Sequence, residues 1–395
     1  MRKTKEKLKL MLFRNLLKIF YIFPVKQNQI FFSSYEGKSY SCNPKYIYEK
    51  LIEKSNGEFL CIWEMNQTDV EEIKGNPILT AHNSLKYIYY ILTSKIIITN
   101  NGITPVLPVR RKQIQINTWH GGGAYKKGGI DVEEDINGSS RKRIEISAKQ
   151  TTFFISSSEI FSEIMKKALL LYNCQFVSCG MPRNDLFFSV NDKIKVQVRK
   201  KLNILTKKRL VLYAPTYRGN AGEDNFSDEI EMLDVQRLLS VLKKKFGEDW
   251  IFLFRSHYFS EHNFELEENC RNVSKYPDMQ ELLYTVDVLI TDYSSSVWDF
   301  SFTDKPGFLY TPDLSKYKKE RDFYLDIDEW PYPVCRNNEE LEQEIIKFNE
   351  ESQKRRNEKH HTMLKSYETG CASEQIYNLI KEQCQSKEKR NGKEP

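Results

Sequence analysis

Residues 289–300, LITDYSSSVWDF, carry a local pattern that indicates the fold class. An apolar run ending at Thr291 predicts a buried strand, the polar residues 292–296 predict a turn, and a helical pattern follows over residues 297–302. Strand, turn and helix in this order are the building unit of α/β folds.

The same alternation extends outward from this stretch over most of the chain. Helical patterns occur at residues 44–53, 158–171 and 229–245, between short apolar runs. Most runs are continuously apolar, as expected of parallel strands covered on both faces. We therefore predict an α/β doubly wound fold. The candidate strands are residues 29–33, 59–63, 95–99, 113–117, 153–156, 209–214, 250–255, 288–291 and 307–310.

The length of 395 residues suits two to three domains of about 100–200 residues each. The polar stretch at residues 189–201 separates two strand and helix series, which predicts lobes at residues 26–188 and 189–384. The second lobe includes helices predicted over residues 337–384. Residues 385–395 are predicted to form a polar tail.

The net charge of +6 is concentrated at the N-terminus. Residues 1–20 hold seven Lys or Arg against one Glu, which leaves 53 basic and 53 acidic side chains in the other 375 residues. The charge balance therefore does not indicate nucleic-acid binding by the globular part. Eight scattered Cys without a Cys-x-x-Cys motif favour reduced thiols over a disulfide framework or a zinc site. No run reaches the roughly 20 apolar residues of a membrane span.

Residues 1–25 predict a basic amphipathic helix that ends at Pro24. Arg14 and Lys18 interrupt the apolar run, which is not typical of a secretory signal. We expect the helix to lie in the interface of an anionic membrane leaflet; the alternative is packing on the protein's own body. The apolar face comprises Leu8, Leu12, Leu16, Ile19, Phe20 and Phe23, and the basic face comprises Lys3, Lys7, Arg14 and Lys18.

Two nucleotide-binding motifs are excluded. Gly37-Lys38-Ser39 is similar to the end of a Walker A loop, but the glycine required five positions earlier is Phe32. No Gly-x-Gly-x-x-Gly follows a predicted strand. The sequence therefore supports neither a P-loop NTPase nor a dinucleotide-dependent dehydrogenase.

A first candidate site follows the strand predicted at residues 113–117, where the sequence reads TWHGGGAYKK from Thr118 to Lys127. His120 precedes three glycines, which permit close backbone approach. An imidazole accepts a proton from a hydroxyl near neutral pH, and Lys126 and Lys127 are suited to hold an anion. The alternative is a flexible turn with an incidental histidine.

Two further groups end strands in the second half of the chain. Arg218 follows one strand, while Arg255 and His257 follow the next, which suggests a phosphate pocket as an alternative to surface salt bridges. Ser294, Ser295 and Ser296 open the helix of the first stretch and either bind an anion or simply cap it.

Together these groups resemble the CDP-glycerol glycerophosphotransferase family, which includes teichoic acid primases and polymerases and related capsule polymerases. The resemblance covers residues 29–335. It differs at residues 120–123, His-Gly-Gly-Gly, where many members have His-Gly-Thr-Pro. The motifs that carry it are WHG at 119–121 with KK at 126–127, YAPT at 213–216 with Arg218, RSH at 255–257 and ITDYSS at 290–295, with FFSSYEGK at 31–38 and Lys305-Pro306.

The resemblance implies a GT-B-like fold, two Rossmann-like lobes facing a cleft, on the cytoplasmic face of the plasma membrane as a peripheral protein. It implies transfer of glycerol phosphate or ribitol phosphate from CDP-glycerol or CDP-ribitol to a hydroxyl of an undecaprenyl-linked acceptor, with release of CMP. The pathway would be teichoic acid or capsular polymer synthesis. No cofactor is implied, and no essential metal is expected, because no acidic pair accompanies the motifs.

The resemblance also implies residue roles. His120 would deprotonate the acceptor hydroxyl, and Arg218, Arg255 and His257 would neutralise the donor pyrophosphate. Two alternatives stay open: a GT-B glycosyltransferase that uses a nucleotide sugar, and a non-catalytic membrane scaffold. Thr216, Asp292, Ser294, Ser295 and Ser296 are assigned to donor binding, and Gly121, Gly122, Lys126 and Lys127 to the acceptor side or to holding an anion.

Overall fold

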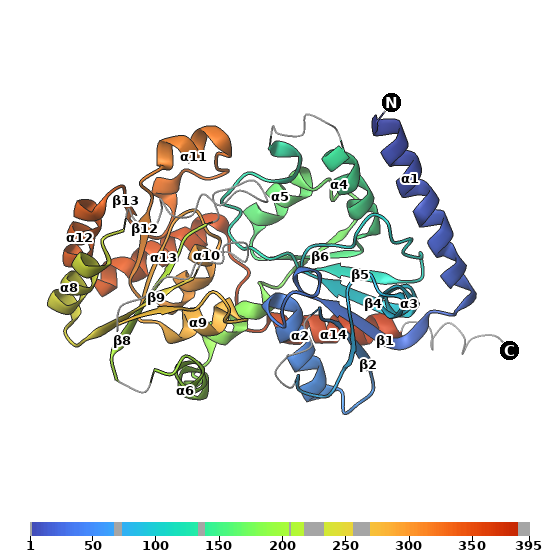
Figure 1. Ribbon diagram of the computed structural model, residues 1–395, viewed down its shortest axis with the longest axis horizontal. Coiled ribbons are helices and arrows are strands. Elements are labelled where there is room, and N and C mark those ends of the chain that lie inside the picture. Colours follow the sequence, from blue (N-terminus) through green and yellow to red (C-terminus); the bar gives the residue numbers. More distant parts are fainter. Residues whose placement is uncertain are drawn as a thin grey trace. The chain divides into compact units, whose positions relative to one another are not determined.

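The computed structural model describes residues 2–66, 73–132, 139–204, 207–216, 233–255 and 269–385, without the side chains of residues 2–9 and 139–140. The chain divides into two compact units, each an α/β layer structure (Figure 1). The first unit comprises Met1–His120, Gly128–Asp185 and Tyr367–Pro395. The second comprises Gly121–Lys127 and Leu186–Ser366.

The first unit is built on a seven-stranded parallel sheet in the order β3-β2-β1-β4-β5-β6-β7. Its central strand β4 has the sequence SKIIIT and is buried throughout, as the continuous apolar run predicts. The strands are β1 (Lys26–Ser33), β2 (Leu60–Glu64), β3 (Ile78–Thr80), β4 (Ser94–Thr99), β5 (Ile114–Asn117), β6 (Phe153–Ser156) and β7 (Gln175–Ser178).

The second unit is built on a six-stranded parallel sheet in the order β10-β9-β8-β11-β12-β13. Thr291, the last residue of β11, pairs with Ala214, the last residue of β8, so the two strands end level with each other. The strands are β8 (Arg209–Ala214), β9 (Trp250–Phe254), β10 (Cys270–Asn272), β11 (Val288–Thr291), β12 (Gly307–Tyr310) and β13 (Val334–Cys335).

Both sheets have the Rossmann order, in which the third strand of the unit lies at one edge and the fourth lies beside the first. The strand order reverses between β1 and β4 in the first unit and between β8 and β11 in the second. Open α/β sheets bind their ligands beyond the carboxyl ends of the strands at such switch points. The predicted pair of Rossmann-like lobes is confirmed, and two places for a site follow from it.

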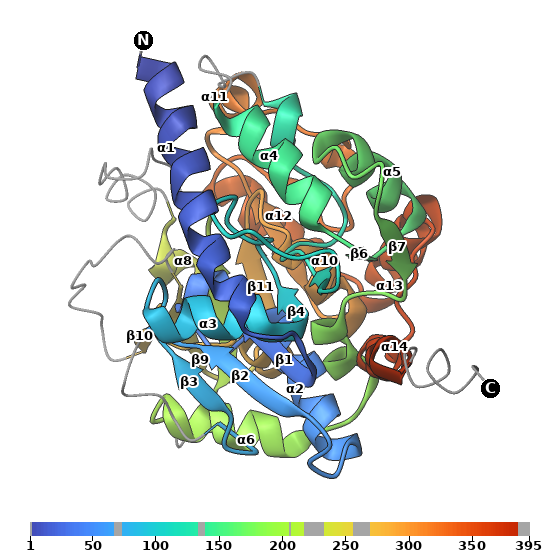
Figure 2. The same ribbon diagram turned by 90° about the vertical axis from the view of Figure 1, so that its right-hand side faces the viewer.

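Helices connect the strands and cover both sheets (Figures 1 and 2). Side-chain caps fix several of their starts: Ser84, Ser158, Asp234, Asn337 and Asn349 each accept a hydrogen bond from a backbone N–H of the first turn. The helices are α1 (Arg2–Leu17), α2 (Cys42–Lys54), α3 (Leu85–Thr93), α4 (Ser139–Gln150), α5 (Glu159–Ala168), α6 (Asp192–Lys201), α8 (Val235–Phe246), α9 (Met279–Thr285), α10 (Ser296–Phe300), α11 (Leu314–Glu320), α12 (Asn338–Lys347), α13 (Glu350–Leu364) and α14 (Ala372–Gln385).

The division into units differs from the predicted lobes in two places. The predicted linker at residues 189–201 is largely α6, and the second unit already begins at Leu186. The predicted second lobe also included all terminal helices, whereas α14 belongs to the first unit. The reason is local: the Asp185 carboxylate accepts the N–H groups of Ala372 and Ser373 at the start of α14, and α14 packs on α2.

The predicted N-terminal helix consists of α1 followed by a 3-10 turn, η1 (Lys18–Ile22). Leu17 and Phe20 pack against the first unit's apolar cluster, which includes Phe31, Ile91 and Ile97. Within the described residues, no helix combines the length and the apolar character needed to cross a membrane.

Candidate functional site

At the switch point of the first unit, His120 lies two residues beyond the Thr118 that follows β5. Its Nδ1 atom is 2.9 Å from the carbonyl oxygen of Asn100, which follows β4. A carbonyl oxygen only accepts, so Nδ1 carries the proton and donates it to this bond. Nε2 then holds the lone pair, which makes it the atom of His120 that can accept a proton from a hydroxyl.

Aromatic rings surround the imidazole. The indole of Trp119 stacks on it with ring centroids 4.6 Å apart, and the ring of Tyr35 lies 6.0 Å away. Tyr35 and Glu36 both have positive φ, at 50° and 57°, a conformation that costs a non-glycine residue about 1–2 kcal/mol. The Oδ1 atom of Asn100 accepts the Tyr35 N–H at 2.8 Å and so holds this strained turn beside His120.

The backbone of His120 is fixed from a third direction. Nη1 of the buried Arg183 donates to the His120 carbonyl oxygen at 2.8 Å. The Arg183 N–H in turn donates to Oδ1 of Asn43, whose amide group donates to the carbonyl oxygens of Thr118 and Trp119. Asn43, Asn100 and Arg183 were not predicted from the sequence. These residues come together only in the folded first unit.

The glycine segment after His120 lies in the second unit, which the sequence analysis did not anticipate. Gly121 and Gly122 are buried there, and Lys126 forms an antiparallel bridge with Phe323. The Lys127 ammonium is 2.7 Å from Oδ2 of Asp322, and this hydrogen bond keeps the pKa of Asp322 below its usual value. The anion-holding role of Lys126 and Lys127 stays a prediction.

At the switch point of the second unit, Asp292 follows β11 and Thr216 follows β8. The Thr216 N–H is 2.9 Å from both carboxylate oxygens of Asp292, and its hydroxyl donates to Oδ1 at 2.6 Å. The Thr291 hydroxyl donates to the Ala214 carbonyl oxygen, which joins the same two strand ends. Asp292 is buried, and these bonds show it holding the Pro215–Thr216 turn. Direct donor binding by either residue stays a prediction.

The basic residues of this unit are only partly described. Nη1 of Arg255 donates to the carbonyl oxygens of Val273 and Tyr276, which fixes the loop after β10. Arg218 and His257 lie outside the described residues, so their predicted roles stay predictions.

In the serine turn before α10, the side chain of the N-cap residue Ser295 makes no capping hydrogen bond, whereas that of Ser294 accepts one. The Ser296 N–H donates to Oγ of Ser294 at 3.3 Å, and the N–H groups of Val297 and Trp298 bond to the carbonyl oxygens of Ser294 and Ser295. These bonds agree with the capping alternative, while anion binding at Ser294–Ser296 stays a prediction. The neighbouring Tyr293 stacks on Tyr317 at 3.9 Å.

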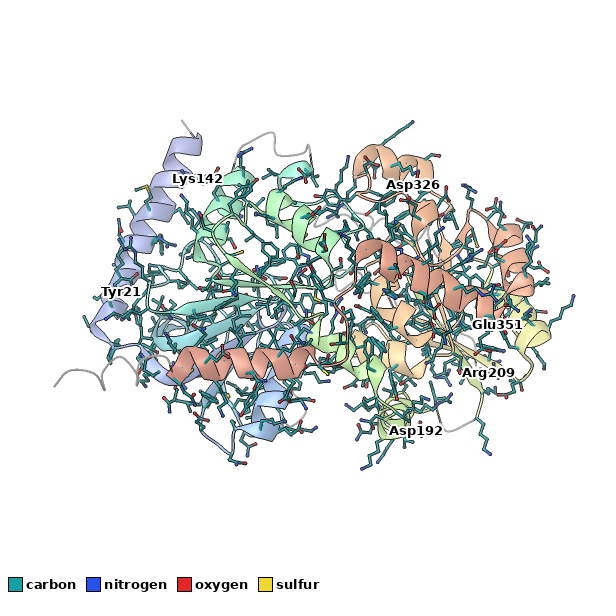
Figure 3. All side chains as sticks on the ribbon, turned by 180° about the vertical axis from the view of Figure 1, so that it is seen from behind. Tyr21, Lys142, Asp192, Arg209, Asp326 and Glu351 are labelled. Carbon is teal, nitrogen blue, oxygen red and sulfur yellow. The ribbon has the colours of Figure 1, made fainter. Side chains whose placement is uncertain are left out.

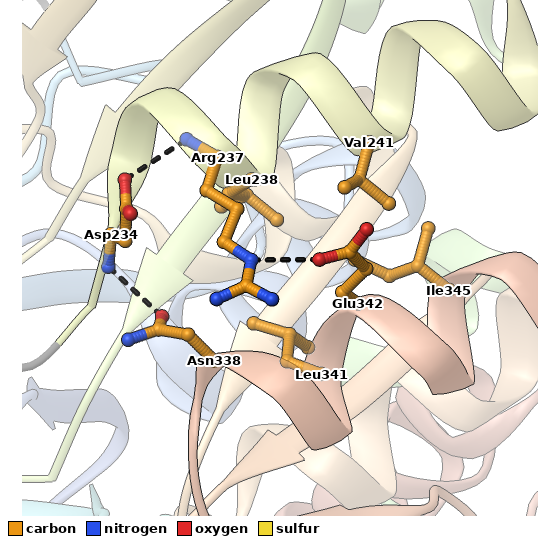
Figure 4. Close-up of a pocket in the computed structure, with 8 residues that line it drawn as sticks. All are labelled: Asp234, Arg237, Leu238, Val241, Asn338, Leu341, Glu342 and Ile345. Atoms are coloured by element: carbon orange, nitrogen blue, oxygen red, sulfur yellow. Dashed lines mark hydrogen bonds and ion pairs between the residues drawn. The ribbon is translucent and has the colours of Figure 1, made fainter.

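Neither the pocket of the second unit nor any cluster of metal-ligating residues adds a candidate site among the described residues. A small pocket between α8 and α12 (Figure 4) lies on the flank of the second sheet, and its polar groups pair with one another, Arg237 with Glu342 and the Asp234 N–H with Asn338. In the part of the chain that the structure describes, no group of three or more His, Cys, Asp or Glu side chains is arranged to hold a metal ion.

Some side chains of the N-terminal helix contact the first unit, and others are exposed. Arg14 donates to the carbonyl oxygens of Pro105 and Leu107, and Phe20 packs on the first unit's apolar cluster, which agrees with the alternative of packing on the protein's own body. Membrane contact by Arg14 and Phe20 stays a prediction. Leu12 and Leu16 are exposed as predicted, and Lys18 is exposed and bonds to Asn15. The side chain of Lys7 lies outside those that the structure describes. Among the described side chains of this segment, the exposed large hydrophobic residues are Met11, Leu12, Phe13, Leu16, Ile19, Tyr21, Ile22 and Phe23.

A family model and curated relatives show which known proteins this chain is similar to. The family model described as CDP-Glycerol:Poly(glycerophosphate) glycerophosphotransferase matches residues 15–382. The teichoic acid poly(glycerol phosphate) polymerase of Bacillus subtilis (strain 168) is 30% identical over 86% of this chain, which spans only 46% of that protein. The teichoic acid ribitol-phosphate primase of Bacillus spizizenii is 25% identical, over 91% of this chain and 92% of that protein.

Solved structures of a wall teichoic acid polymerase are also similar to this chain. The structure of the wall teichoic acid polymerase TagF superposes with a TM-score of 0.80 and 27% identity, over 98% of this chain and 97% of that one. A TagF variant soaked with CDPG gives a TM-score of 0.81 at 25% identity, over 98% of both chains.

Proposed function

Because the chain belongs to the CDP-glycerol:poly(glycerophosphate) glycerophosphotransferase family, we propose that it transfers an alditol phosphate from a CDP-alditol to a hydroxyl and releases CMP. The relatives are named as glycerol-phosphate and ribitol-phosphate enzymes of teichoic acid synthesis, so both CDP-glycerol and CDP-ribitol are candidate donors. The acceptor is a membrane lipid-linked glycan or polymer of the teichoic acid or capsule type.

The observation that carries this proposal is the orientation of His120. With Nδ1 donating to Asn100 O, Nε2 is the ring nitrogen that carries the lone pair and can take the proton of the acceptor hydroxyl. The hydroxyl oxygen then attacks the distal phosphorus of the donor, the bond to the bridging oxygen breaks, and CMP leaves. The work of the second unit is electrostatic: Arg218, Arg255 and His257 neutralise the phosphates. Asp292 holds the Pro215–Thr216 turn through Thr216. We expect no essential metal.

The test is a donor panel. The full-length protein is incubated with labelled CDP-glycerol, CDP-ribitol or a UDP-sugar and a lipid-linked acceptor, and the products are sized. We expect CMP release and acceptor extension with one of the two CDP-alditols. Turnover of a UDP-sugar alone would favour the nucleotide-sugar glycosyltransferase, and no turnover of any donor would favour the non-catalytic scaffold.

We also propose that the first unit binds the anionic cytoplasmic face of the plasma membrane as a peripheral protein, through α1 and α4. Leu16 and Ile22 are exposed over 65% and 75% of their surface, and apolar side chains at this density suit an interfacial helix. Arg141, Lys142 and Arg143 are exposed on α4. Arginine and lysine near an anionic surface contribute about 1 kcal/mol each.

The two helices share one support. Arg14 of α1 and Gln150 of α4 both donate to the carbonyl oxygen of Leu107, each at 2.7 Å. Figures 2 and 3 show α1 beside α4 in the first unit, and Figure 3 labels Tyr21 and Lys142 from this region. The helix with the exposed apolar residues and the helix with the exposed basic residues are therefore neighbours in this unit.

A matched pair of triple variants tests the membrane proposal. Leu12→Ser/Leu16→Ser/Ile19→Ser removes exposed apolar surface from the helix. Leu85→Ser/Val190→Ser/Val196→Ser removes side chains that are 76%, 91% and 65% exposed elsewhere. Because each buried leucine contributes about 1.5–3 kcal/mol, we expect the first triple to lower sedimentation with phosphatidylglycerol liposomes more than about tenfold, and the second to leave it unchanged. Equal binding by both triples would contradict this assignment.

A further inference from the structure

We infer that Gly121–Lys127 is a positioning segment that ties the catalytic His120 to the donor-side turn of the second unit, with Tyr125 as its main anchor. The inference rests on the proposed function. It assigns roles to Tyr125, Lys127 and Asp322 beyond those of the phosphate-binding and proton-accepting groups. None of these three residues needs to touch substrate for the inference to hold.

The division of the chain is the first observation. His120 belongs to the first unit and Gly121 to the second, so the peptide bond between them joins the two units. His120 is fixed on its own side by Asn100 and Arg183. Whatever fixes Gly121–Lys127 therefore acts on His120 through the covalent chain.

The segment is held in the second unit by a short antiparallel pairing. The Tyr324 N–H donates to the Tyr125 carbonyl oxygen at 2.8 Å, and the Lys127 N–H donates to the Asp322 carbonyl oxygen at 3.2 Å. The ammonium of Lys127 adds its bond to the Asp322 carboxylate. Residues 125–127 and 322–324 thus behave as one two-stranded element.

The side chain of Tyr125 anchors this element in the interior. Nδ1 of the buried His360 donates to the Glu329 carbonyl oxygen at 3.0 Å, which leaves Nε2 to accept the Tyr125 hydroxyl at 2.8 Å. Burial lowers the pKa of His360 to about 3, so this acceptor is neutral at physiological pH. The Tyr125 ring also lies 4.2 Å from the ring of Trp330.

The same element reaches the donor-side turn. The ring of Phe323 stacks on Tyr317 at 5.5 Å and lies 5.4 Å from Tyr293. Tyr293 directly follows Asp292, whose carboxylate holds Thr216. A continuous set of contacts within the second unit therefore runs from the residue after His120 to the residues at the end of β8 and β11.

Gly122 gives the sharpest way to disturb the segment. A Cβ atom at this position would lie 2.1 Å from Cδ1 of Trp298, a fully buried ring, so an alanine forces the segment to move. Gly128, six residues later, has extended backbone at φ −159°, and a methyl group added there would meet no described atom within 4 Å. Gly122→Ala and Gly128→Ala are the same chemical change with opposite steric consequences.

The first experiment compares these two variants in the full-length protein, by kcat with a CDP-alditol and by calorimetric donor affinity. We expect Gly122→Ala to lower kcat at least about a hundredfold, as for a displaced catalytic group, and by a larger factor than it weakens donor affinity. Gly128→Ala should retain wild-type kcat. An unchanged kcat in Gly122→Ala, or an equal loss in Gly128→Ala, overturns the inference, whereas an inactive wild-type protein overturns the proposed function instead.

The second experiment does not depend on Gly122→Ala folding. Tyr125→Phe removes only the hydroxyl that His360 accepts, and Tyr332→Phe removes another buried hydroxyl of the same unit as its control. We expect kcat to fall roughly five- to tenfold in Tyr125→Phe, the equivalent of one hydrogen bond, and to be unchanged in Tyr332→Phe. Equal kcat values in the two variants would overturn the role of Tyr125.

A charge swap separates positioning from anion binding. Lys127→Asp and Asp322→Lys should each lower kcat, and the double variant should recover most of the loss, because it restores the pair with reversed polarity. If Lys127 instead holds a substrate anion, the double variant stays as impaired as Lys127→Asp. That result would overturn the positioning role.

Discussion

The switch points of the two sheets share a strand order and differ in what they hold. In the first, a backbone carbonyl, Asn100 O, receives the proton-bearing nitrogen of His120. In the second, a buried carboxylate, Asp292, receives the N–H and the hydroxyl of Thr216. A neutral carbonyl orients an imidazole and leaves its other nitrogen to act as a base, whereas a carboxylate bound three times fixes a turn. Under the proposed function, the same frame would provide a proton acceptor in one unit and a rigid turn near the donor in the other.

The largest expected effect separates these roles at His120. His120→Ala removes the proton acceptor, so we expect turnover to fall by about a hundredfold to ten-thousandfold. The Trp119 backbone is held by Asn43 and the donor-side turn by Asp292, so calorimetry should find unchanged affinity for the CDP-alditol. A variant that no longer binds the donor would break the proposed division of labour between the switch points.

The second effect concerns Asp292. Asp292→Asn keeps the size of the side chain but loses the charge that accepts three bonds from Thr216. Bonds to a charged group are worth about 1.5–3 kcal/mol, so KM for the donor should rise roughly tenfold to a hundredfold. Asp326→Asn, at an exposed cap of the same unit, is the control and should retain the wild-type KM. An increase in KM for both variants would show that the effect is not specific to the switch point.

The third effect is acid sensitivity of the second unit. Burial lowers the pKa of His360 to about 3 and that of His361 to about 4, below the value near 6.5 of an unfolded chain. Below pH 6.5 the unfolded state therefore binds protons that the folded state does not, and stability falls with pH. At pH 5 the loss is about 2 kcal/mol for each histidine.

Melting temperatures at pH 7 and pH 5, with hydrogen exchange to locate the opening, measure this effect. We expect α13 to lose protection first on acidification. His360→Gln/His361→Gln should start less stable but show a smaller pH dependence. An identical slope in the double variant would place the acid-sensitive groups elsewhere.

The smallest expected effect is that of a chelator. EDTA treatment followed by desalting should leave CDP-alditol turnover unchanged, because both switch points are expected to act through His, Arg and hydroxyl groups. A requirement for added magnesium would contradict the proposal that the second unit's own residues neutralise the donor phosphates.

The strands that the sequence predicted and those that it missed differ in position. The nine predicted strands correspond to strands that have neighbours on both sides, while β3, β7, β10 and β13, at the four sheet edges, were missed. Interior strands such as β4 are continuous apolar runs. Edge strands are short or partly exposed, as in QFVS of β7, and leave no such pattern.

The residues of the candidate site also fall into those that the sequence predicted and those that it did not. His120, Thr216, Asp292 and the serine turn were found because they follow strands in recognisable motifs. Asn43 and Arg183 were not, because they hold the backbone of residues 118–120 from segments 60 or more residues away in the sequence. The assignment of Gly121–Lys127 to the second unit was also unpredictable, because it depends on Trp298, Asp322 and His360.

The chain re-enters the first unit at Tyr367 and ends there with α14, so most of the second unit is an insertion within the first. Residues 186–366 form an insertion between Asp185 and Tyr367 of the first unit. The two sides of the insertion are joined, because Glu368 accepts the Met181 N–H and the Asn184 amide, each at 3.0 Å, while Asp185 caps α14. A few-residue linker can therefore replace the insertion when the first unit is produced alone, whereas a simple C-terminal truncation removes one of its own helices. An exchange of the second unit between relatives would therefore have to transfer Gly121–Lys127 together with residues 186–366.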